Sequence, residues 1–124
     1  AFPNISDLKS VEVKINSFSA LLEREEKSEN NIVYSINGEN SSEELFKSTY
    51  QSIMGLSVDG VLSGSFNKSK PFATILYTME NGSTEKIELC DYDQFSAAVI
   101  LNGKAQFYIK KTKITELEYV LEKL

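Results

Sequence analysis

Hydrophobic and polar residues alternate with a period of two in several short stretches of the chain. Residues 11–16 alternate apolar with charged or polar side chains, a pattern typical of a half-buried strand. Residues 32–36 form a short apolar run that ends at Asn37-Gly38, a dipeptide that favours a turn. These patterns predict two strands in the N-terminal third of the chain.

Two successive β-hairpins are predicted further along. Residues 72–79 and 84–89 are strand-like and flank the polar turn 80–83, and residues 97–101 and 105–110 repeat the arrangement. Asn102-Gly103 lies between the last two strands and is typical of a type I′ turn, because both central residues of that turn need positive φ.

Residues 18–27 carry two conflicting signals. Residues 20–27 have strong intrinsic helix propensity, whereas Phe18, Ala20 and Leu22 alternate with more polar neighbours as in a strand. Propensity alone favours a helix here, and the strand remains the alternative.

A first helix is predicted after residue 41. Ser41 and Glu44 have the spacing of a capping box, and Gly55 suits the left-handed residue that ends a helix. Between them, one stripe of hydrophobic residues recurs at helical spacing: Leu45, Phe46, Tyr50, Ile53 and Met54. We expect this stripe to pack against the sheet, and the alternative is that it lines a ligand cavity.

A second helix is predicted from about Thr112 to the end of the chain. Its expected buried face comprises Ile114, Leu117, Leu121 and Leu124, with Val120 beside them. Between the first helix and the hairpins, residues 56–64 predict an extended connector. The residues expected to anchor this connector are Val58, Val61 and Leu62. It is expected to bend at Gly60 and Gly64. Residues 64–71 predict a flexible polar loop.

Composition excludes several classes of function. The 124 residues carry a net charge of −5, which disfavours phosphate backbones and anionic membranes as partners. Histidine is absent, so no Ser–His–Asp triad, Cys–His pair or histidine zinc site can form within the chain. The chain contains no internal repeat or linker, and we expect residues 1–124 to form one domain.

Few residues have the chemistry of a site. Cys90 is the lone cysteine and is expected to be a small buried hydrophobic residue rather than a reactive thiol. Asp91-Tyr92-Asp93 could contribute carboxylates to a calcium ion, but a turn between hairpins is favoured. No pair of carboxylates is singled out for glycoside chemistry. We therefore assign no catalytic, cofactor-binding or metal-binding residue and expect neither a cofactor nor an enzyme.

Three segments together resemble a known family: residues 46–60 (FKSTYQSIMGLSVDG), 74–82 (TILYTMENG) and 107–111 (FYIKK). They resemble bacterial domain-of-unknown-function family 4340, and the resemblance extends over residues 9–124. It implies that residues 18–24 form a strand, which gives a curved antiparallel α+β sheet in the order β-β-β-α-β-β-β-β-α with two helices packed on it. It also implies a bacterial extracytoplasmic location, with anchoring through a lipoprotein segment not present in this chain.

These inferences predict a noncatalytic extracytoplasmic binding or assembly domain. The family implies a role near the membrane, beside transport machinery. An exposed sheet edge would bind a protein partner, either another envelope protein or a second copy, because its unpaired backbone groups can extend a sheet. A small-ligand carrier or a carboxylate enzyme, with Leu45, Phe46 and Tyr50 lining a pocket, is the alternative. A structural spacer in a longer surface protein is the third possibility.

Overall fold

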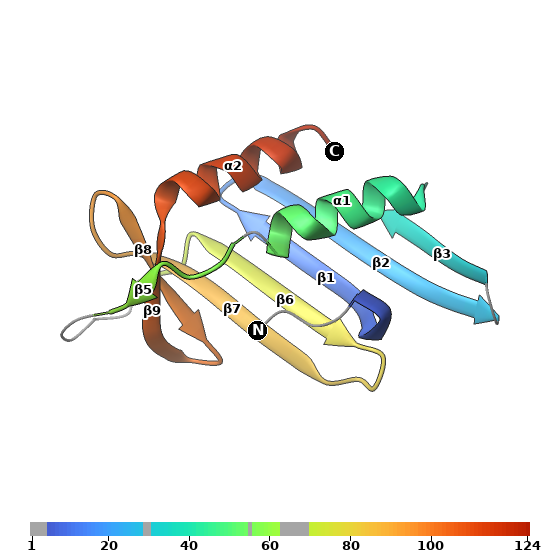
Figure 1. Ribbon diagram of the computed structural model, residues 1–124, viewed down its shortest axis with the longest axis horizontal. Coiled ribbons are helices and arrows are strands. Elements are labelled where there is room, and N and C mark those ends of the chain that lie inside the picture. The colour runs from blue at the N-terminus through green and yellow to red at the C-terminus, as the bar shows by residue number, and fades with distance from the viewer. Residues whose placement is uncertain (1–4, 29–30, 55, 63–69) are drawn as a thin grey trace.

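The protein is a single antiparallel sheet with two α-helices on one face (Figure 1). The computed structural model describes residues 5–28, 31–54, 56–62 and 70–124. Its elements in chain order are a 3-10 helix (Ile5–Asp7), β1 (Leu8–Ile15), β2 (Phe18–Ser28), β3 (Asn31–Ile36), β4 (Glu39–Ser41), α1 (Glu43–Met54), β5 (Gly60–Val61), β6 (Ala73–Met79), β7 (Thr84–Asp91), β8 (Ser96–Leu101), β9 (Lys104–Lys110) and α2 (Lys111–Glu122). The sheet order is β4-β3-β2-β1-β6-β7-β8-β9-β5.

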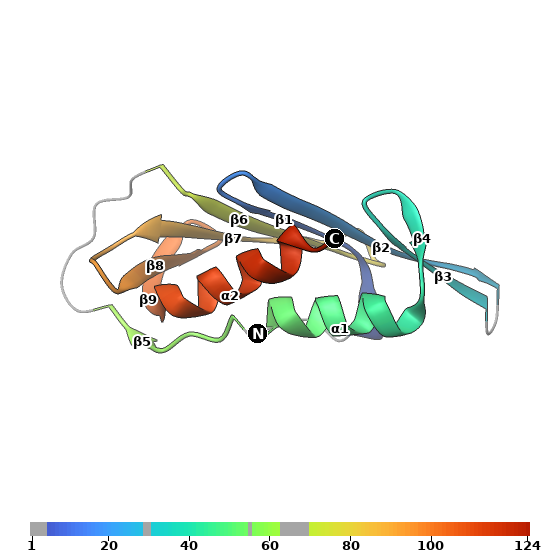
Figure 2. The ribbon, with the colours of Figure 1, turned by 90° about the horizontal axis from the view of Figure 1, so that it is seen from above.

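The expected fold class and element order are confirmed. Figure 2 shows both helices on the same side of the sheet, as an α+β arrangement requires. The structure adds two short strands, β4 and β5, which lie at the two edges of the sheet. They were not predicted because two or three residues are too few to show a period of two.

The chain folds as two halves with the same topology. Strands β1 to β4 form a meander that leads into α1, and β6 to β9 form a second meander that leads into α2. The first strands of the two halves, β1 and β6, pair antiparallel in the middle of the sheet. The halves are therefore related by an approximate two-fold rotation, and β5 is an addition at the edge of β9.

Equivalent hairpin turns support this relation. Asn37 and Asn102 are 65 residues apart, and both adopt positive φ (54° and 49°) before a glycine. The Asn37 side chain accepts a hydrogen bond from the Leu21 backbone N–H, and its own N–H donates to the Leu21 carbonyl. Asn102 makes the same two bonds with Lys86, which lies 65 residues after Leu21. Each turn is thus tied to the strand before the hairpin in the same way.

The two helices also correspond. Three buried positions of α1 lie 68 residues before the three buried positions of α2: Phe46, Thr49 and Ile53, and Ile114, Leu117 and Leu121. Tyr50, which is also buried in α1, has no buried counterpart in α2. Each of these six matching side chains is at most 4% exposed, so they form the buried stripe of each helix. The sequence shows little of this relation because the matching positions hold different residues.

The core lies between the helices and the central strands. Val11, Val13 and Ile15 of β1 are completely buried, and they face Tyr77, Ile75 and Ala73 of β6 in the same order. Because side chains directly opposite each other lie on one face, these pairs form a continuous apolar layer beneath the helices. β1 is buried and pairs with both β2 and β6, and it therefore holds the middle of the sheet together.

Residues 18–28 form a strand, so the helix favoured by intrinsic propensity is wrong and the strand implied by the family resemblance is correct. Ala20 and Leu22 are buried and alternate with more exposed residues. Burying these side chains against the helices outweighs a propensity difference of at most about 0.7 kcal/mol per residue. Arg24 continues the buried face and donates from its guanidinium to the Ser6 carbonyl at 3.3 Å.

The first helix begins one residue later than predicted. Ser42 rather than Ser41 accepts the hydrogen bond from the Leu45 N–H, at 3.1 Å, because Ser41 is the last residue of β4 and pairs with Tyr34. Phe46 and Ile53 are buried as expected, but Leu45 is 49% exposed and does not belong to the core. The Met54 side chain and Gly55 lie outside the described residues.

The connector after α1 packs differently from the prediction. Leu56 is buried, whereas the expected anchors Val58 and Val61 are 45% and 70% exposed. Gly60 does not bend the chain but lies in β5 opposite Tyr108. A Cβ at this position would lie 2.5 Å from the Tyr108 ring, so the side chain of Tyr108 occupies the space that the glycine leaves. Leu62 is half-buried, and residues 63–69, including Gly64 and most of the expected loop, lie outside the described residues.

The second helix begins at Lys111, one residue before the predicted start. Ile114, Leu117 and Leu121 are buried and Val120 packs against the core, as predicted. Leu124 follows the helix and is 39% exposed, so its assignment to the buried face is wrong. The helix ends at Glu122, and a residue beyond its end no longer follows the helical periodicity.

The observed cap of α1 gives a test of the corrected helix start. Replacing Ser42 by Ala should lower the free energy of unfolding by about 1 kcal/mol, because the Leu45 N–H loses its acceptor. Ser41→Ala is the matched control and should cost clearly less, since the Ser41 hydroxyl only donates to the Ser42 carbonyl. Urea unfolding followed by circular dichroism measures both. Equal losses, or a larger loss for Ser41→Ala, would contradict the assignment.

Candidate functional site

The edge of the sheet at β3 is only partly covered. β4 pairs with Tyr34, Ser35 and Ile36, which are the last three residues of β3. The first half of β3, from Asn31 to Val33, pairs with β2 on one side. Among the described residues no strand pairs with it on the other side. This half-strand is therefore an open edge.

The direction of the backbone groups follows from the turn at Asn37. The Asn37 N–H donates to the Leu21 carbonyl at 2.8 Å, so the backbone of residue 37 faces β2. Backbone groups of successive residues in a strand point alternately to its two neighbours. Tyr34 and Ile32 therefore direct their N–H and C=O away from β2. Tyr34 meets β4 there, whereas Ile32 lies beyond the end of β4.

A shallow groove of about 410 Å³ lies along this edge. It is lined by Ile32, Val33, Tyr34, Asn40, Ser41 and Glu43. The Tyr34 ring packs on Phe46 of α1, with ring centroids 4.8 Å apart, and its hydroxyl donates to the Glu43 carboxylate at 3.4 Å. The groove thus combines apolar strand side chains with a polar rim.

The Glu43 carboxylate at this rim remains charged. It accepts a hydrogen bond from the Lys47 ammonium at 2.7 Å, one helical turn away. This bond and the positive charge of Lys47 lower the pKa of Glu43, and the Tyr34 hydroxyl adds to the effect. The same contact raises the pKa of Lys47. The pair stabilises the first turn of α1, where negative charge is favourable.

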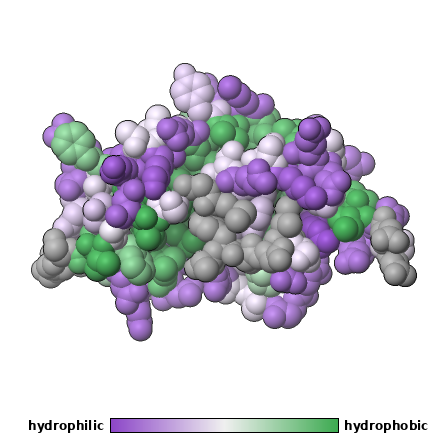
Figure 3. All heavy atoms as spheres, viewed as in Figure 1, coloured by the Kyte–Doolittle hydropathy of each residue, from purple (hydrophilic) through white to green (hydrophobic). Residues whose placement is uncertain are grey.

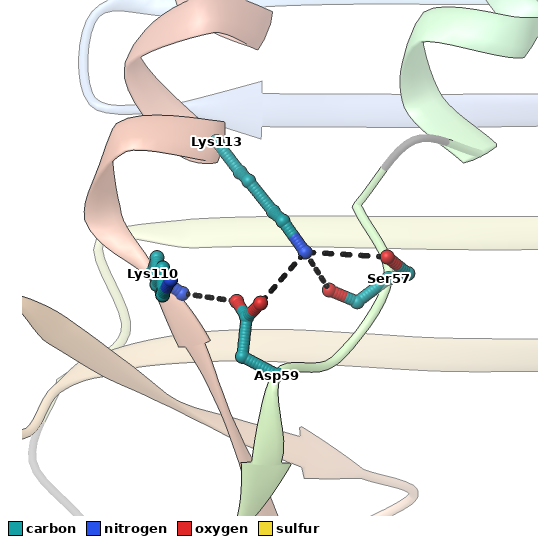
Figure 4. Close-up of polar contacts among 4 residues, drawn as sticks. All are labelled: Ser57, Asp59, Lys110 and Lys113. Carbon is teal, nitrogen blue, oxygen red and sulfur yellow. Dashed lines mark hydrogen bonds and ion pairs between the residues drawn. The ribbon is translucent and has the colours of Figure 1, made fainter.

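A second polar cluster lies at the opposite end of the sheet (Figure 4). The Asp59 carboxylate accepts hydrogen bonds from the Lys110 backbone N–H at 2.7 Å and from the Lys113 ammonium at 2.9 Å. Lys113 also donates to the carbonyl and the hydroxyl of Ser57. The Asp59 N–H in turn donates to the Tyr108 carbonyl. These bonds fasten the connector after α1 to the end of β9 and the first turn of α2.

The cluster holds its carboxylate in the charged form. The hydrogen bond from the Lys110 N–H lowers the pKa of Asp59 most, followed by the bond from Lys113. The side chains of Asp59 and Lys113 are only 16% and 29% exposed. The Lys113 ammonium donates to Asp59 and Ser57, and the Asp59 N–H donates to the Tyr108 carbonyl, so the cluster has the character of a structural clamp.

The acidic segment at residues 91–93 runs from the end of β7 into the turn before β8, as favoured by the sequence, with Asp91 as the last residue of β7. One Asp93 carboxylate oxygen accepts from the backbone N–H groups of Phe95 and Ser96, at 2.9 and 2.7 Å. Asp91 forms an ion pair with Lys111 at 2.6 Å. The two carboxylates therefore have separate structural partners. In the part of the chain that the structure describes, no cluster of three or more Cys, Asp or Glu could hold a metal ion.

Of the other residues considered as site candidates, all but Leu45 lie in the packed interior. Cys90 is completely buried, as predicted for a small hydrophobic residue. Phe46 and Tyr50 are at most 2% exposed and belong to the core, and burial raises the pKa of the Tyr50 hydroxyl. Leu45 instead lines an open groove of about 630 Å³ between α1, the end of α2 and the β3–β4 turn. The three residues thus do not line a common pocket.

Sequence reasoning missed both the open half of β3 and the Asp59 clamp. The length of β4 decides how much of β3 is exposed, and three residues carry no readable period. Asp59 and Lys113 are 54 residues apart, and only the finished fold brings them together. The one signal present for the clamp was the polar residue pair Ser57 and Asp59 within an otherwise apolar connector.

Comparison with known proteins finds no matching family model, no matching curated protein and no matching solved structure. In the described part of the chain, neither helix has the length and apolar character needed to cross a membrane. The proposed function is therefore inferred from the geometry of the chain itself.

The Asp59 clamp predicts a pH-dependent contribution to stability. Because the folded state lowers the pKa of Asp59 below its ordinary value of 3.8, its contribution is present above that value and is lost as the pH falls through the folded pKa. The difference in unfolding free energy between wild type and Asp59→Asn should be largest at neutral pH and shrink in acid.

Urea unfolding at neutral pH and at acidic pH values on both sides of 3.8 measures this difference. Asp91→Asn is the control, since it removes a carboxylate that is 76% exposed. We expect that control to change stability by at most about 1 kcal/mol. A difference for Asp59→Asn that does not vary with pH would contradict the clamp.

Proposed function

We propose that this chain is a noncatalytic binding or assembly domain that takes an extended protein segment along the open half of β3. The observation that carries the proposal is the outward backbone of Ile32 beside the groove of about 410 Å³. An added strand could hydrogen-bond to that backbone and place alternate side chains against Ile32 and Tyr34. The partner is a segment of an envelope protein or of a second copy.

The environment of this edge suits strand addition. β3 contains no charged residue and no proline, so nothing on the strand itself opposes a neighbouring strand. The Tyr34 hydroxyl and the Glu43 carboxylate at the rim offer polar contacts to a bound segment. The edge beyond β4 is only three residues long, which fits a weak or transient contact better than a permanent one.

The absence of catalysis is part of the same proposal. The chain has no histidine, and the carboxylates with lowered pKa, Glu43 and Asp59, are held by lysines in structural pairs. Burial raises the pKa of the Tyr50 and Tyr77 hydroxyls and keeps both neutral. These groups stabilise the fold. Their pKa values are shifted away from neutral pH, whereas acid–base catalysis needs a group whose pKa lies near neutral pH.

The proposed location is the outside of a bacterial cytoplasmic membrane, with anchoring by a segment not present in this chain. This proposal rests on the resemblance of residues 46–60, 74–82 and 107–111 to an extracytoplasmic family. A single cysteine, which cannot form an internal disulfide, is compatible with it. A position beside membrane-transport machinery is proposed on the same resemblance.

Changing the free backbone group of Ile32 tests the binding edge. Ile32→Pro removes the outward N–H, and Ile32→Ala is the matched control that loses similar side-chain packing but keeps the N–H. A photo-crosslinking residue at position 31 should capture a protein in the host cell. Ile32→Pro should reduce that capture by about tenfold or more, equivalent to 1.4 kcal/mol, while Ile32→Ala should change it little.

Two further measurements make the result decisive. Circular dichroism and thermal unfolding establish that both variants are folded, and a crosslinker at the exposed Lys14, on the opposite face of the sheet, reports nonspecific contacts. Equal capture from positions 14 and 31, or capture that Ile32→Pro leaves unchanged in a folded protein, would overturn the proposed binding mode.

A further inference from the structure

A cavity of about 330 Å³ opens on the helix-bearing face of the second half of the sheet. Its floor is formed by buried aliphatic side chains of four strands: Ile75, Leu89, Val99 and Ile109. The half-buried Ile87 and Leu101 surround this floor, and Leu56 and Val58 of the connector form one wall. Figure 3 shows hydrophobic atoms gathering on this face, over the ends of β7 and β8. Small-molecule sites have volumes of this order and mostly apolar walls.

The approximate two-fold relation allows the apolar surface around this cavity to be compared with the equivalent surface of the first half. With the separation of 65 residues, Ile87 corresponds to Leu22 and Leu101 corresponds to Ile36. In the first half, Leu22 and Ile36 are both buried, and α2 packs on β2. Among the described residues neither helix packs closely on β7. Within the described part of the chain, the equivalent positions of the second half, Ile87 and Leu101, are therefore only half-buried.

The charged and polar groups at the rim of the cavity determine which polar end group a ligand can carry. Glu85 lies directly opposite the buried Tyr77, so its carboxylate is on the cavity side of β7. Lys86 is the next residue and its side chain points to the other face. Ser57 and Asn102, which are neutral, complete the polar side chains at the rim. The Lys113 ammonium donates to Ser57, but its charge is balanced by the ion pair with Asp59. A neutral or cationic group is therefore favoured at the mouth, and a carboxylate is disfavoured.

The wall of the cavity is held in place. Ser57 and Asp59, on either side of Val58, are bound by Lys113 of α2, and the Leu56 N–H donates to the Ile53 carbonyl. The connector therefore cannot fold into the space below it without breaking these bonds. A preformed cavity of this kind lowers the ordering cost of binding.

We propose that this cavity binds an unbranched aliphatic chain with a neutral or cationic polar end, such as an alkyl alcohol or alkyl amine. Its volume of about 330 Å³ lies at the small end of the range for ligand sites, about 300–1,000 Å³, which suits a single short chain. The all-aliphatic floor contains no hydrogen-bonding side chain, so it selects by shape and hydrophobicity alone. This activity goes beyond the proposed protein-binding edge, which lies in the other half of the sheet.

Methyl NMR of the full chain with 1-decylamine and 1-decanol as probes tests the proposal. The methyl signals of Ile75, Leu89 and Val99 should shift with saturation, while those of Leu21 and Leu76, on the opposite face, should not. Decanoate should bind about tenfold more weakly than decylamine because its carboxylate meets Glu85. Leu101→Trp should weaken decylamine binding about tenfold or more by filling the mouth.

Leu21→Trp is the matched control, since Leu21 is also half-buried but lies on the opposite face of the sheet. It should leave the affinity for decylamine unchanged. Ile87→Phe replaces Leu101→Trp if thermal unfolding shows that the latter does not fold. The proposed binding in the cavity would be overturned if the methyl shifts did not saturate or were equal on both faces of the sheet. It would also be overturned if a folded variant with a filled cavity bound decylamine with unchanged affinity. Decanoate binding as tightly as decylamine would overturn the proposed ligand class.

Discussion

The antiparallel pairing of β1 with β6 is the interaction on which the rest of the structure depends. It joins the first strands of two halves that otherwise fold as separate meanders. Val13 and Ile75 lie opposite each other at this junction and are at most 1% exposed. Each half alone would leave one side of such a strand unpaired and its apolar face partly open to water. The junction therefore gives both halves a common core beneath α1 and α2.

The two halves share a topology but differ in how their apolar surfaces are covered. α2 crosses to the first half and packs on β2, whereas no helix of the described chain covers β7 to the same extent. The clamp between Asp59 and Lys113 instead holds an extended connector over the second half. This difference leaves a cavity at one end of the sheet, while the short β4 leaves an open edge at the other. The two proposed binding features thus follow from two separate differences between the halves.

Much of the sheet could be predicted from the sequence, because period-two burial and Asn-Gly turns are local signals. Residues 18–28 show the limit of local reasoning: their helix propensity is real, but burial of Ala20 and Leu22 in a tertiary core decides their conformation. The predicted cap, Ser41, lies one residue before the observed cap, Ser42, because the end of β4 determines where α1 begins. In the sequence, the correspondence of the halves shows only at the two Asn-Gly turns that begin at Asn37 and Asn102, and two shared turns are too few to reveal a repeat.

Native-state hydrogen exchange of the backbone amides tests most directly whether β1 and β6 join the two halves into one cooperative unit. The account predicts that buried amides on both sides of the junction, in β2 and in β7, exchange through the same global unfolding, with the free energy found for β1 and β6. Exchange of the β6–β9 amides through a separate opening of clearly lower free energy, with β1–β3 still protected, would contradict it.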